Sequence, residues 1–284
     1  MKQRSCSYRW WRSRAVGLGL AATFALAPPA GAGDGAGVSF EAVQALPFAP
    51  PAAQFAYGEE DSQYGLYWAP AGDAAEAPLV VLVHGGCWLA DYGVEHLRPL
   101  AGALAGAGFA VWAPEYRRVG NGGGDPATLE DLRAAIGRVP ALPVAPRGIA
   151  FVGHSAGGQL ALWAAASASG VLPAPDLAVG LAVITDLATF GAAGGSCGEA
   201  VAPFLGAAAS PARYRALSPA FLRYRMPVVL LQGDADPIVP PSQAAALPGA
   251  TVHALPGAGH FDLIHPGGEA FARLLSVLRE GLSP

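Results

Sequence analysis

A serine stands at the centre of the pentapeptide Gly-His-Ser-Ala-Gly, which fills positions 153–157. An apolar run, 149–152, precedes it, and a helix-forming stretch, 159–166, follows it. A strand, a sharp turn and a helix form the context in which a G-x-S-x-G sequence presents its serine as a nucleophile. The small residues around the serine permit the tight turn. The sequence therefore predicts nucleophilic chemistry at Ser155, if the chain also supplies a base and an acid.

The base must be a histidine that can reach the serine and remove its proton. His260 follows Pro-Gly-Ala-Gly, a flexible loop after the last predicted strand, and is the favoured candidate. His265, at the start of the final predicted helix, is the alternative. His96 and His253 lie within a predicted helix and a predicted strand and are interpreted as structural. His154 shares the turn of the serine, so its side chain is expected to point elsewhere.

The base in turn needs an acidic partner that fixes its tautomer. Two aspartates, Asp234 and Asp236, follow the predicted strand 228–231. Asp234 is nearer to the strand and is expected to cap the turn by accepting backbone N–H bonds. Asp236 lies one step further along, where its carboxylate can turn toward the histidine loop. We therefore predict a triad in the chain order Ser155, Asp236, His260, which is a known order for such triads.

A tetrahedral intermediate also needs hydrogen-bond donors for its oxyanion. The sequence His-Gly-Gly-Cys-Trp at 84–88 follows the apolar predicted strand 79–83. Its glycines let the backbone lie close to a substrate and turn N–H groups inward. We assign the oxyanion hole to the backbone N–H groups of Gly86, Cys87 and Ala156.

Large apolar side chains near these motifs are candidates for the substrate pocket, with core packing as the alternative for each. The predicted contacts are Trp88, Phe190 and Phe261, with Leu89, Tyr92 and Phe204 as further candidates. No residues have the spacing of a metal site, so we expect neither a metal ion nor an organic cofactor.

The cysteines suggest a cross-link beside the predicted site. Of the three cysteines, Cys6 lies near the N-terminus, Cys87 lies in the oxyanion loop and Cys197 lies in a Gly/Ala-rich excursion, 188–210. Two cysteines in an exported chain suggest one disulfide. A bridge between Cys87 and Cys197 would clamp the excursion beside the active site; two unpaired thiols are the alternative.

Predicted strands and helices alternate along most of the chain. This alternation implies a mostly parallel, doubly wound sheet of about eight strands with right-handed crossovers. Ligands in such sheets bind at the carboxyl ends of the strands, where all the motifs above fall. The predicted strands are 63–68, 79–83, 109–113, 149–152, 177–184, 228–231 and 251–255, and the main predicted helices are 94–107, 125–139, 159–166, 211–224, 241–247 and 267–281.

The N-terminus has the features of a secretory signal. Residues 1–14 carry five basic side chains and no acidic one, and residues 15–27 form an apolar segment of thirteen residues. Such a segment is shorter than a membrane span. Pro-Pro-Ala-Gly-Ala at 28–32 supplies an A-x-A cleavage site, which we place after Ala32. An uncleaved membrane anchor is the alternative.

These features divide the chain into three parts. We predict a signal peptide over residues 1–32, a flexible lead-in over 33–54 and one catalytic domain over 55–284. The whole chain has 17 basic and 21 acidic residues, a net charge of −4. Without the five basic residues of the leader, 12 bases face 21 acids, a net charge of −9. An acidic chain of this kind argues against nucleic acid and against anionic membrane surfaces as partners.

Together the motifs resemble the α/β-hydrolase superfamily of the esterase and lipase type, and within it bacterial feruloyl/acetyl-xylan esterase-like proteins and kynurenine formamidases. The resemblance is carried by residues 84–88, 115–117, 153–158, 233–240 and 259–264. It implies the α/β-hydrolase fold and a serine hydrolase that cleaves carboxylic esters through an acyl-enzyme. Cys87 stands where related enzymes often have glycine, alanine or an aromatic residue, a change that a backbone donor tolerates.

Two alternatives accompany this expectation. The sequence His-Phe-Asp-Leu at 260–263 resembles formamidases, so an arylformamidase-like amide hydrolase is one alternative. A hydrolase-fold binding protein without catalysis is the other, although such proteins usually lack a triad residue. The leading expectation is an exported, periplasmic or extracellular esterase. Its partner is a small-molecule ester, and it has no stable membrane insertion after cleavage.

Overall fold

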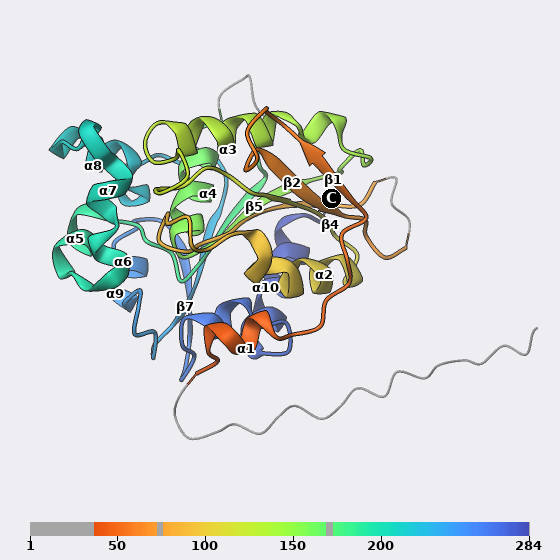
Figure 1. Cartoon of the computed structure of the whole chain (residues 1–284). Helices are drawn as coiled ribbons and strands as arrows, with labels where there is room; N and C mark the ends of the chain where they lie inside the picture. Colours follow the sequence, from red (N-terminus) through yellow and green to blue (C-terminus); the bar gives the residue numbers. More distant parts are fainter. Residues whose placement is uncertain (1–36, 73–75, 169–172, 284) are drawn as a thin grey trace, which may run out of the picture. The chain divides into compact units, whose positions relative to one another are not determined.

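The computed structural model describes residues 37–72, 76–168 and 173–283 (Figure 1). The predicted signal peptide, 1–32, and the first residues of the predicted lead-in lie outside the described residues.

Eight strands form one sheet in the order β1-β2-β4-β3-β5-β6-β7-β8. β1 pairs antiparallel with β2 and β2 pairs antiparallel with β4, whereas the remaining neighbours are parallel. The predicted mostly parallel sheet of about eight strands is therefore confirmed. The strands are β1 (Ala53–Ala56), β2 (Tyr64–Trp68), β3 (Leu79–Val83), β4 (Ala110–Pro114), β5 (Ile149–His154), β6 (Leu177–Leu181), β7 (Val228–Gly233) and β8 (Thr251–Leu255).

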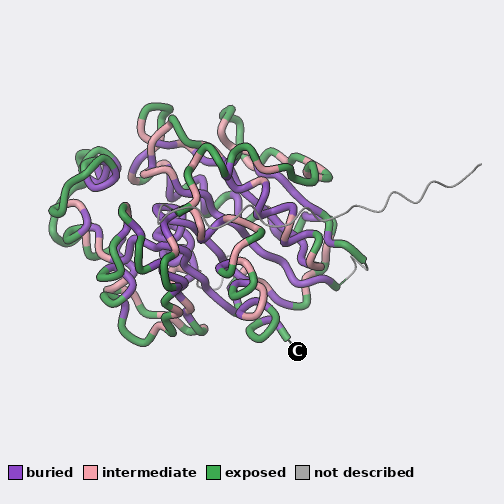
Figure 2. The backbone as a smooth tube through the Cα atoms, turned by 90° about the horizontal axis from the view of Figure 1, so that it is seen from below, coloured by how far each residue is buried: buried purple, intermediate pink, exposed green. Residues whose placement is uncertain are grey.

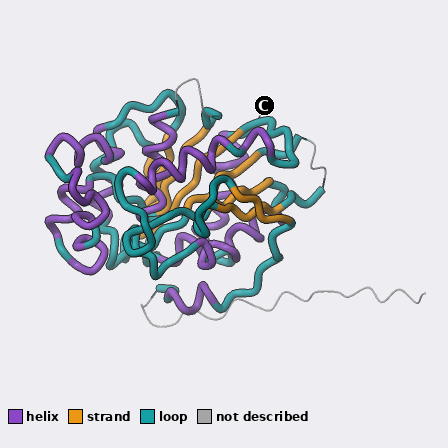
Figure 3. The backbone as a smooth tube through the Cα atoms, turned by 45° about the horizontal axis from the view of Figure 1, so that its top comes forward, coloured by secondary structure: helices purple, strands orange, loops and turns teal. Residues whose placement is uncertain are grey.

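Helices cover both faces of this sheet, with α3 and α4 on one face and α2 and α10 on the other (Figures 1 and 3). None of the helices in the described ranges has both the length and the apolar character that crossing a membrane requires. The α-helices are α1 (Phe40–Gln44), α2 (Arg98–Gly106), α3 (Ala127–Gly137), α4 (Ala156–Ser167), α5 (Leu187–Ala193), α6 (Gly195–Glu199), α7 (Val201–Leu205), α8 (Pro211–Leu217), α9 (Pro241–Ala245) and α10 (Glu269–Gly281). The 3₁₀ helices are η1 (Val94–Leu97), η2 (Val139–Ala141), η3 (Gly206–Ala208), η4 (Pro219–Phe221) and η5 (Phe261–Ile264).

The sheet separates two apolar cores. Alternate side chains of a strand point to opposite faces, so Val81 and Val83 of β3 pack with α3 and α4, while Val80 and Leu82 pack with α2 and α10. Every residue of β3 is buried, and Figure 2 shows buried backbone, drawn in purple, running through the interior. This burial on both faces explains why the central strands are uninterrupted apolar runs.

Two segments are more regular than the sequence predicts. The predicted flexible lead-in contains α1, whose N-terminus is capped by Ser39 and whose Val43 is completely buried. The Gly/Ala-rich excursion after β6 forms α5, α6, α7 and η3, seen at the left of Figure 1. These short helices form because apolar residues such as Phe190 and Phe204 are buried against the core above α4.

The turn from β5 into α4 is packed against the end of β3. A Cβ atom added at Gly157 would overlap the carbonyl oxygens of His84 and Val83. Both contacts are with backbone atoms, which cannot move aside as a flexible side chain can. The first turn of α4 can therefore approach β3 only if position 157 has no side chain.

We expect Gly157→Ala to lower the free energy of unfolding by about 3 kcal/mol or more, because overpacking against backbone forces a main-chain shift. The matched control is Gly106→Ala at the end of α2, where an added Cβ meets nothing within 4 Å. That variant should be unchanged or more stable by about 0.5–1 kcal/mol. Urea unfolding of both variants measures the difference, and equal stabilities would contradict the close approach.

Candidate active site

The predicted functional residues gather at the carboxyl edge of the sheet. The oxyanion loop follows β3, Ser155 follows β5, Asp236 follows β7 and His260 follows β8. β3 and β5 are neighbours, and β7 and β8 are neighbours with β6 between the two pairs. The parallel arrangement therefore brings four segments that are distant in sequence to one side of the molecule.

Ser155 has a backbone conformation that a residue with a side chain rarely adopts. Its φ is 56° and its ψ is −124°. The N–H of Ser155 donates to the carbonyl oxygen of Leu181 over 2.9 Å, while its own carbonyl accepts from Gly158 and Gln159. Strain of this kind persists only where the surrounding contacts impose it. Here these hydrogen bonds hold the serine in a sharp turn at the end of β5.

The predicted acid and base are in direct contact. Asp236 Oδ2 lies 2.8 Å from His260 Nδ1. Asp236 Oδ1 accepts the backbone N–H groups of Ile238 and Val239 over 2.8 and 2.9 Å. Both side chains are buried. The carboxylate is therefore held by its own loop and leaves His260 Nε2 as the ring nitrogen available to another partner.

The alternative acid and base have other roles. Asp234 is exposed, and its Oδ1 accepts the backbone N–H of Gly257 over 2.6 Å, as expected for a residue that caps the turn. His265 Nδ1 accepts the N–H of Gly267 over 3.0 Å and does not line the pocket that contains Ser155.

The oxyanion loop follows β3 with three consecutive positive φ angles. They are 102° at Gly86, 53° at Cys87 and 58° at Trp88. A Cβ atom at Gly86 would overlap the side chain of Tyr92. In the described part of the chain, the N–H groups of Gly86 and Cys87 make no hydrogen bond. Ala156 is the first residue of α4, where backbone N–H groups have no partner within the helix.

A buried polar network supports this loop. Tyr116 donates its hydroxyl to the carbonyl oxygen of His84 over 2.6 Å, and the two rings stack with centroids 4.2 Å apart. His84 Nε2 lies 3.1 Å from Glu115 Oε1, which also accepts from Arg118. Glu115 Oε2 accepts the N–H of Val94 over 2.9 Å. Glu115, Tyr116 and Arg118 thus fix the start of the oxyanion loop, whereas Arg117 pairs with Asp131.

A disulfide joins the oxyanion loop to the excursion. Cys87 and Cys197, in α6, are bonded, with Cα atoms 5.0 Å apart and 110 positions between them in sequence. The bridge holds α6 beside the loop that carries the predicted oxyanion donors. Ser196 and Cys197 consequently line the same pocket as Ser155.

Ser155 and His260, two residues of the predicted triad, face a pocket of about 210 Å³. Within the described residues, no hydrogen bond joins the serine hydroxyl to the imidazole. The pocket is bounded by α1, the oxyanion loop with Tyr92, η1, the serine turn, α6 and the loops that carry Asp236 and His260. The lining residues are Phe40, Glu41, Gly86, Cys87, Tyr92, His96, His154, Ser155, Ser196, Cys197, Ile238, His260 and Phe261.

Two of the three predicted pocket residues are elsewhere. Phe261 lines the pocket, but Trp88 and Phe190 are in the core. The positive φ of Trp88 turns its indole inward, where it stacks on Phe204 and donates Nε1–H to Gln159 over 3.1 Å. Phe190 is a residue of α5 whose side chain packs into the core and is only 3% exposed. Leu89 and Phe204 are also absent from the lining, whereas Tyr92 is present.

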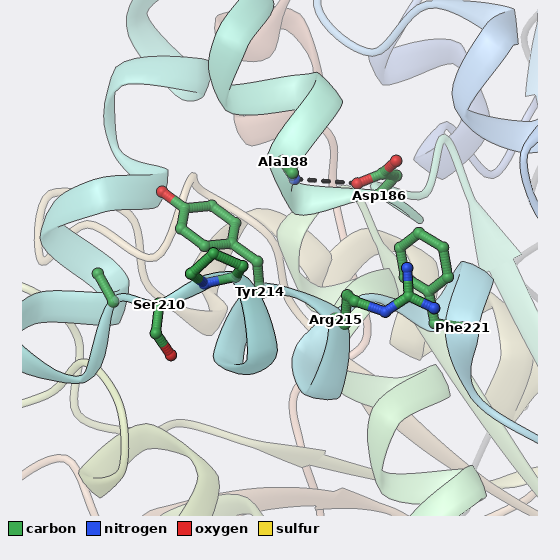
Figure 4. Close-up of a pocket in the computed structure, with 8 residues that line it drawn as sticks. Asp186, Ala188, Ser210, Tyr214, Arg215 and Phe221 are labelled. Atoms are coloured by element: carbon green, nitrogen blue, oxygen red, sulfur yellow. Dashed lines mark hydrogen bonds between the residues drawn. The ribbon is translucent and has the colours of Figure 1, made fainter.

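A second hollow, of about 490 Å³, contains no triad residue. Figure 4 shows it between the start of α5 and the α8–η4 segment. There Arg215 lies over the ring of Phe221 with its guanidinium 4.2 Å from the centroid, and Asp186 accepts the N–H of Ala188. Asp186 and Arg215 therefore both interact with neighbouring residues of this hollow.

Sequence reasoning missed six residues that line the pocket: Phe40, Glu41, His96, His154, Ser196 and Ile238. Phe40 and Glu41 come from α1, in the segment predicted as a flexible lead-in. Ser39 ahead of this segment is a helix N-cap signal that could have revealed α1. His154 and His96 were interpreted as pointing elsewhere and as structural, respectively. No local signal marks their direction, because it depends on the packing of distant loops.

The histidines form a buried chain of rings beneath the pocket. Ring centroids are 4.5 Å apart for His154 and His260, 6.4 Å for His96 and His154, and 5.9 Å for His84 and His96. His154 Nε2–H donates to the carbonyl oxygen of His260 over 3.1 Å. The residue before Ser155 therefore holds the backbone of the predicted base, His260.

Burial keeps three of these imidazoles neutral. Loss of solvation, with the nearby Arg118 cation, lowers the pKa of His84 to about 3. Loss of solvation, with the neighbouring His84, lowers the pKa of His96 to about 3. Burial also lowers the pKa of His154 well below its ordinary value. Across the described ranges, no three His, Cys, Asp or Glu side chains are arranged to hold a metal ion.

The first prediction from this site concerns the disulfide. A cross-link over 110 positions restricts the unfolded chain, so Cys197→Ser should lower the free energy of unfolding by about 4–5 kcal/mol. Urea unfolding with and without dithiothreitol measures this. The reductant should destabilise the natural protein and leave Cys197→Ser unchanged. Labelling of two free thiols in the native, unreduced protein would refute the bridge.

The second prediction concerns pH. Because the pKa values of His84 and His96 lie near 3 in the folded state, the unfolded chain binds more protons below pH 6.5. We expect the free energy of unfolding to fall as pH is lowered from about 6.5 toward 3, by up to about 1.4 kcal/mol per pH unit for each histidine. Urea unfolding at pH 7, 6 and 5 gives the slope.

His96→Gln should reduce this slope. The matched control is His253→Gln, because His253 is a partly exposed histidine of β8. Equal slopes for the two variants would show that burial of His96 does not contribute.

The structure is similar to several solved esterases. A truncated carbohydrate esterase from gut microbiota has a TM-score of 0.67 at 21% identity, over 82% of this chain and 98% of that one. Esterase B from Lactobacillus rhamnosis gives 0.70 at 22% identity, over 85% and 89%. Esterase 2 from Thermogutta terrifontis, phosphonylated by sarin, gives 0.65 at 24% identity, over 84% and 98%. At these identities the similarity establishes the fold.

The sequence comparison identifies the family. No curated protein matches the sequence. Residues 66–250, more than half of the chain, match the family described as BD-FAE. The matched segment contains the oxyanion loop, the serine turn and Asp236. The chain therefore belongs to the BD-FAE family, an esterase family with the α/β-hydrolase fold.

Proposed function

We propose that this protein is a secreted serine hydrolase that cleaves carboxylic esters through a Ser155–His260–Asp236 triad. One observation carries the proposal. The buried Asp236–His260 pair opens onto the same pocket as a serine held at φ 56°. Such an arrangement places an oriented base beside a nucleophile, as acyl transfer requires.

In the first half of the reaction, Ser155 Oγ attacks the acyl carbon while its proton moves to His260 Nε2. Asp236 accepts the Nδ1–H and stabilises the imidazolium that forms. The oxyanion accepts hydrogen bonds from the N–H groups of Gly86, Cys87 and Ala156, each worth about 3–4 kcal/mol in the transition state. The imidazolium then protonates the leaving alcohol, and an acyl-enzyme remains.

In the second half, His260 removes a proton from water, and the hydroxyl oxygen attacks the acyl-enzyme. The bond to Ser155 Oγ breaks, the serine regains its proton from the imidazolium, and the carboxylic acid leaves. The hydrogen bond between Ser155 and His260 forms when substrate occupies the pocket, since such contacts commonly tighten only in the complex.

The comparisons support ester chemistry. The family is an esterase family, and a structural neighbour is an esterase phosphonylated by sarin, an agent that modifies an activated nucleophile. The proposal of export rests on the basic and apolar pattern of residues 1–32. The Cys87–Cys197 disulfide is consistent with an oxidising compartment.

We expect Ser155→Ala to lower kcat for 4-nitrophenyl acetate by about 10⁴ to 10⁶, because the nucleophile is lost while the fold is retained. A fluorophosphonate probe should add one phosphonyl group to the natural protein, mapped to Ser155 by peptide mass spectrometry, and none to the variant. N-formylkynurenine assayed beside the ester distinguishes an arylformamidase.

The assignment of the base has its own control. His260→Gln should lose activity to a similar degree, whereas His265→Gln should retain it. Retained ester hydrolysis in Ser155→Ala would overturn the triad. A natural protein without turnover or probe labelling would instead be a binding protein with a hydrolase fold.

A further inference from the structure

The outer wall of the active-site pocket comes from α1. The ring of Phe40 contacts Tyr92, Phe261 and His96, with centroids 5.5, 5.4 and 5.6 Å away. Tyr92 packs on Gly86 of the oxyanion loop, and Phe261 follows the base His260. Phe40 therefore spans the opening between the two loops that carry the chemistry.

Several contacts keep α1 in this place. Val43, one turn after Phe40, is completely buried in the core beneath α2. Ser39 Oγ caps the helix by accepting the N–H of Ala42 over 3.1 Å. The N–H of Val38 donates to Asp262 Oδ2 over 3.0 Å, which ties the helix to the histidine loop. The residue after Phe40 is therefore held at the pocket rather than on a free arm.

That residue is Glu41, which is exposed and lines the pocket. Among the described lining residues, it is the sole carboxylate, and no lysine or arginine lines the pocket. The lowered pKa values of His96 and His154 leave both rings neutral at pH 7. Beneath the pocket, the charge of Arg118 is offset by its ion pair with Glu115. Two other carboxylates lie near the site, but neither lines the pocket: Asp236 accepts two backbone N–H groups and faces His260 Nδ1, and Asp262 accepts the N–H groups of Val38 and Gly259. Among the described residues, Glu41 is therefore the carboxylate that a bound substrate meets directly.

We propose that Glu41 makes this site select neutral and cationic esters and reject esters that carry a carboxylate on the acyl or alcohol part. This inference rests on the proposed ester hydrolysis and names the substrate class of the same pocket. The carboxylate acts through its field on the bound substrate and takes no part in bond making, so Glu41 is a specificity-determining residue.

The test uses three aryl acetates that differ in the charge of one para substituent. They are phenyl acetate, 4-acetoxybenzoate and 4-(trimethylammonio)phenyl acetate. The readout is the ratio of kcat/KM for each charged ester to kcat/KM for the neutral ester. The esters differ in intrinsic reactivity, but this difference cancels when the same ratio is compared between protein variants. At separations of several ångströms near a protein surface, we expect Glu41→Gln to raise the anionic ratio about three- to tenfold and lower the cationic ratio by a similar factor.

Glu269→Gln is the matched control. It removes a carboxylate from the first turn of another helix, α10, at an exposed position away from the pocket. Both ratios should be as in the natural protein. Added salt should weaken the selectivity of the natural protein and have little effect on that of Glu41→Gln, because the Debye length falls to about 3 Å at 1 M.

The outcomes separate the two proposals. Hydrolysis of the neutral ester with ratios equal in Glu41→Gln and Glu269→Gln would overturn the role of Glu41 and leave the triad intact. A common loss for all three esters in Glu41→Gln would assign α1 a structural role only and would also overturn the inference. If the natural protein hydrolysed none of the three esters, the proposed ester hydrolysis itself would be contradicted, and with it the inference about Glu41.

Discussion

The active site depends on one close approach, that of the first turn of α4 to the carbonyl group of His84. The contact requires a residue without a side chain at Gly157. The same carbonyl oxygen accepts the Tyr116 hydroxyl, and the His84 ring is paired with Glu115. The nucleophile turn and the oxyanion loop are therefore packed as one unit. A shift of either would move the serine relative to the N–H groups that must meet the developing charge, and small displacements of this kind are costly to catalysis.

Features with a local backbone requirement could be predicted from sequence. Glycines around Ser155 and in the oxyanion loop mark the sharp turns, and apolar runs bounded by them mark the central strands. The choice of Asp236 over Asp234 also agrees with the geometry: Asp236 contacts His260, whereas Asp234, two positions earlier, caps a turn. The parallel order of strands then places these motifs together.

Directions of side chains could not be predicted in the same way. Trp88 turns into the core because its φ is positive. A tryptophan in the sequence gives no sign that the backbone will adopt this conformation. His154 reaches the carbonyl of His260, 106 positions away. Phe40 lies against Phe261 because α1 packs on a loop from the other end of the domain. Each of these depends on contacts between segments distant in sequence, about which local patterns carry no information.

The bond from the Val38 N–H to Asp262 spans 224 positions. During synthesis α1 is made first, yet its partner is made almost last. Contacts between residues so far apart in sequence form late. Closing the long loop between them costs chain entropy, and this cost is offset only after the intervening chain has folded. The wall of the pocket is thus completed only when the entire domain has emerged and folded. A nascent chain that already holds the serine turn would lack both His260 and this wall until residues 260–262 are in place.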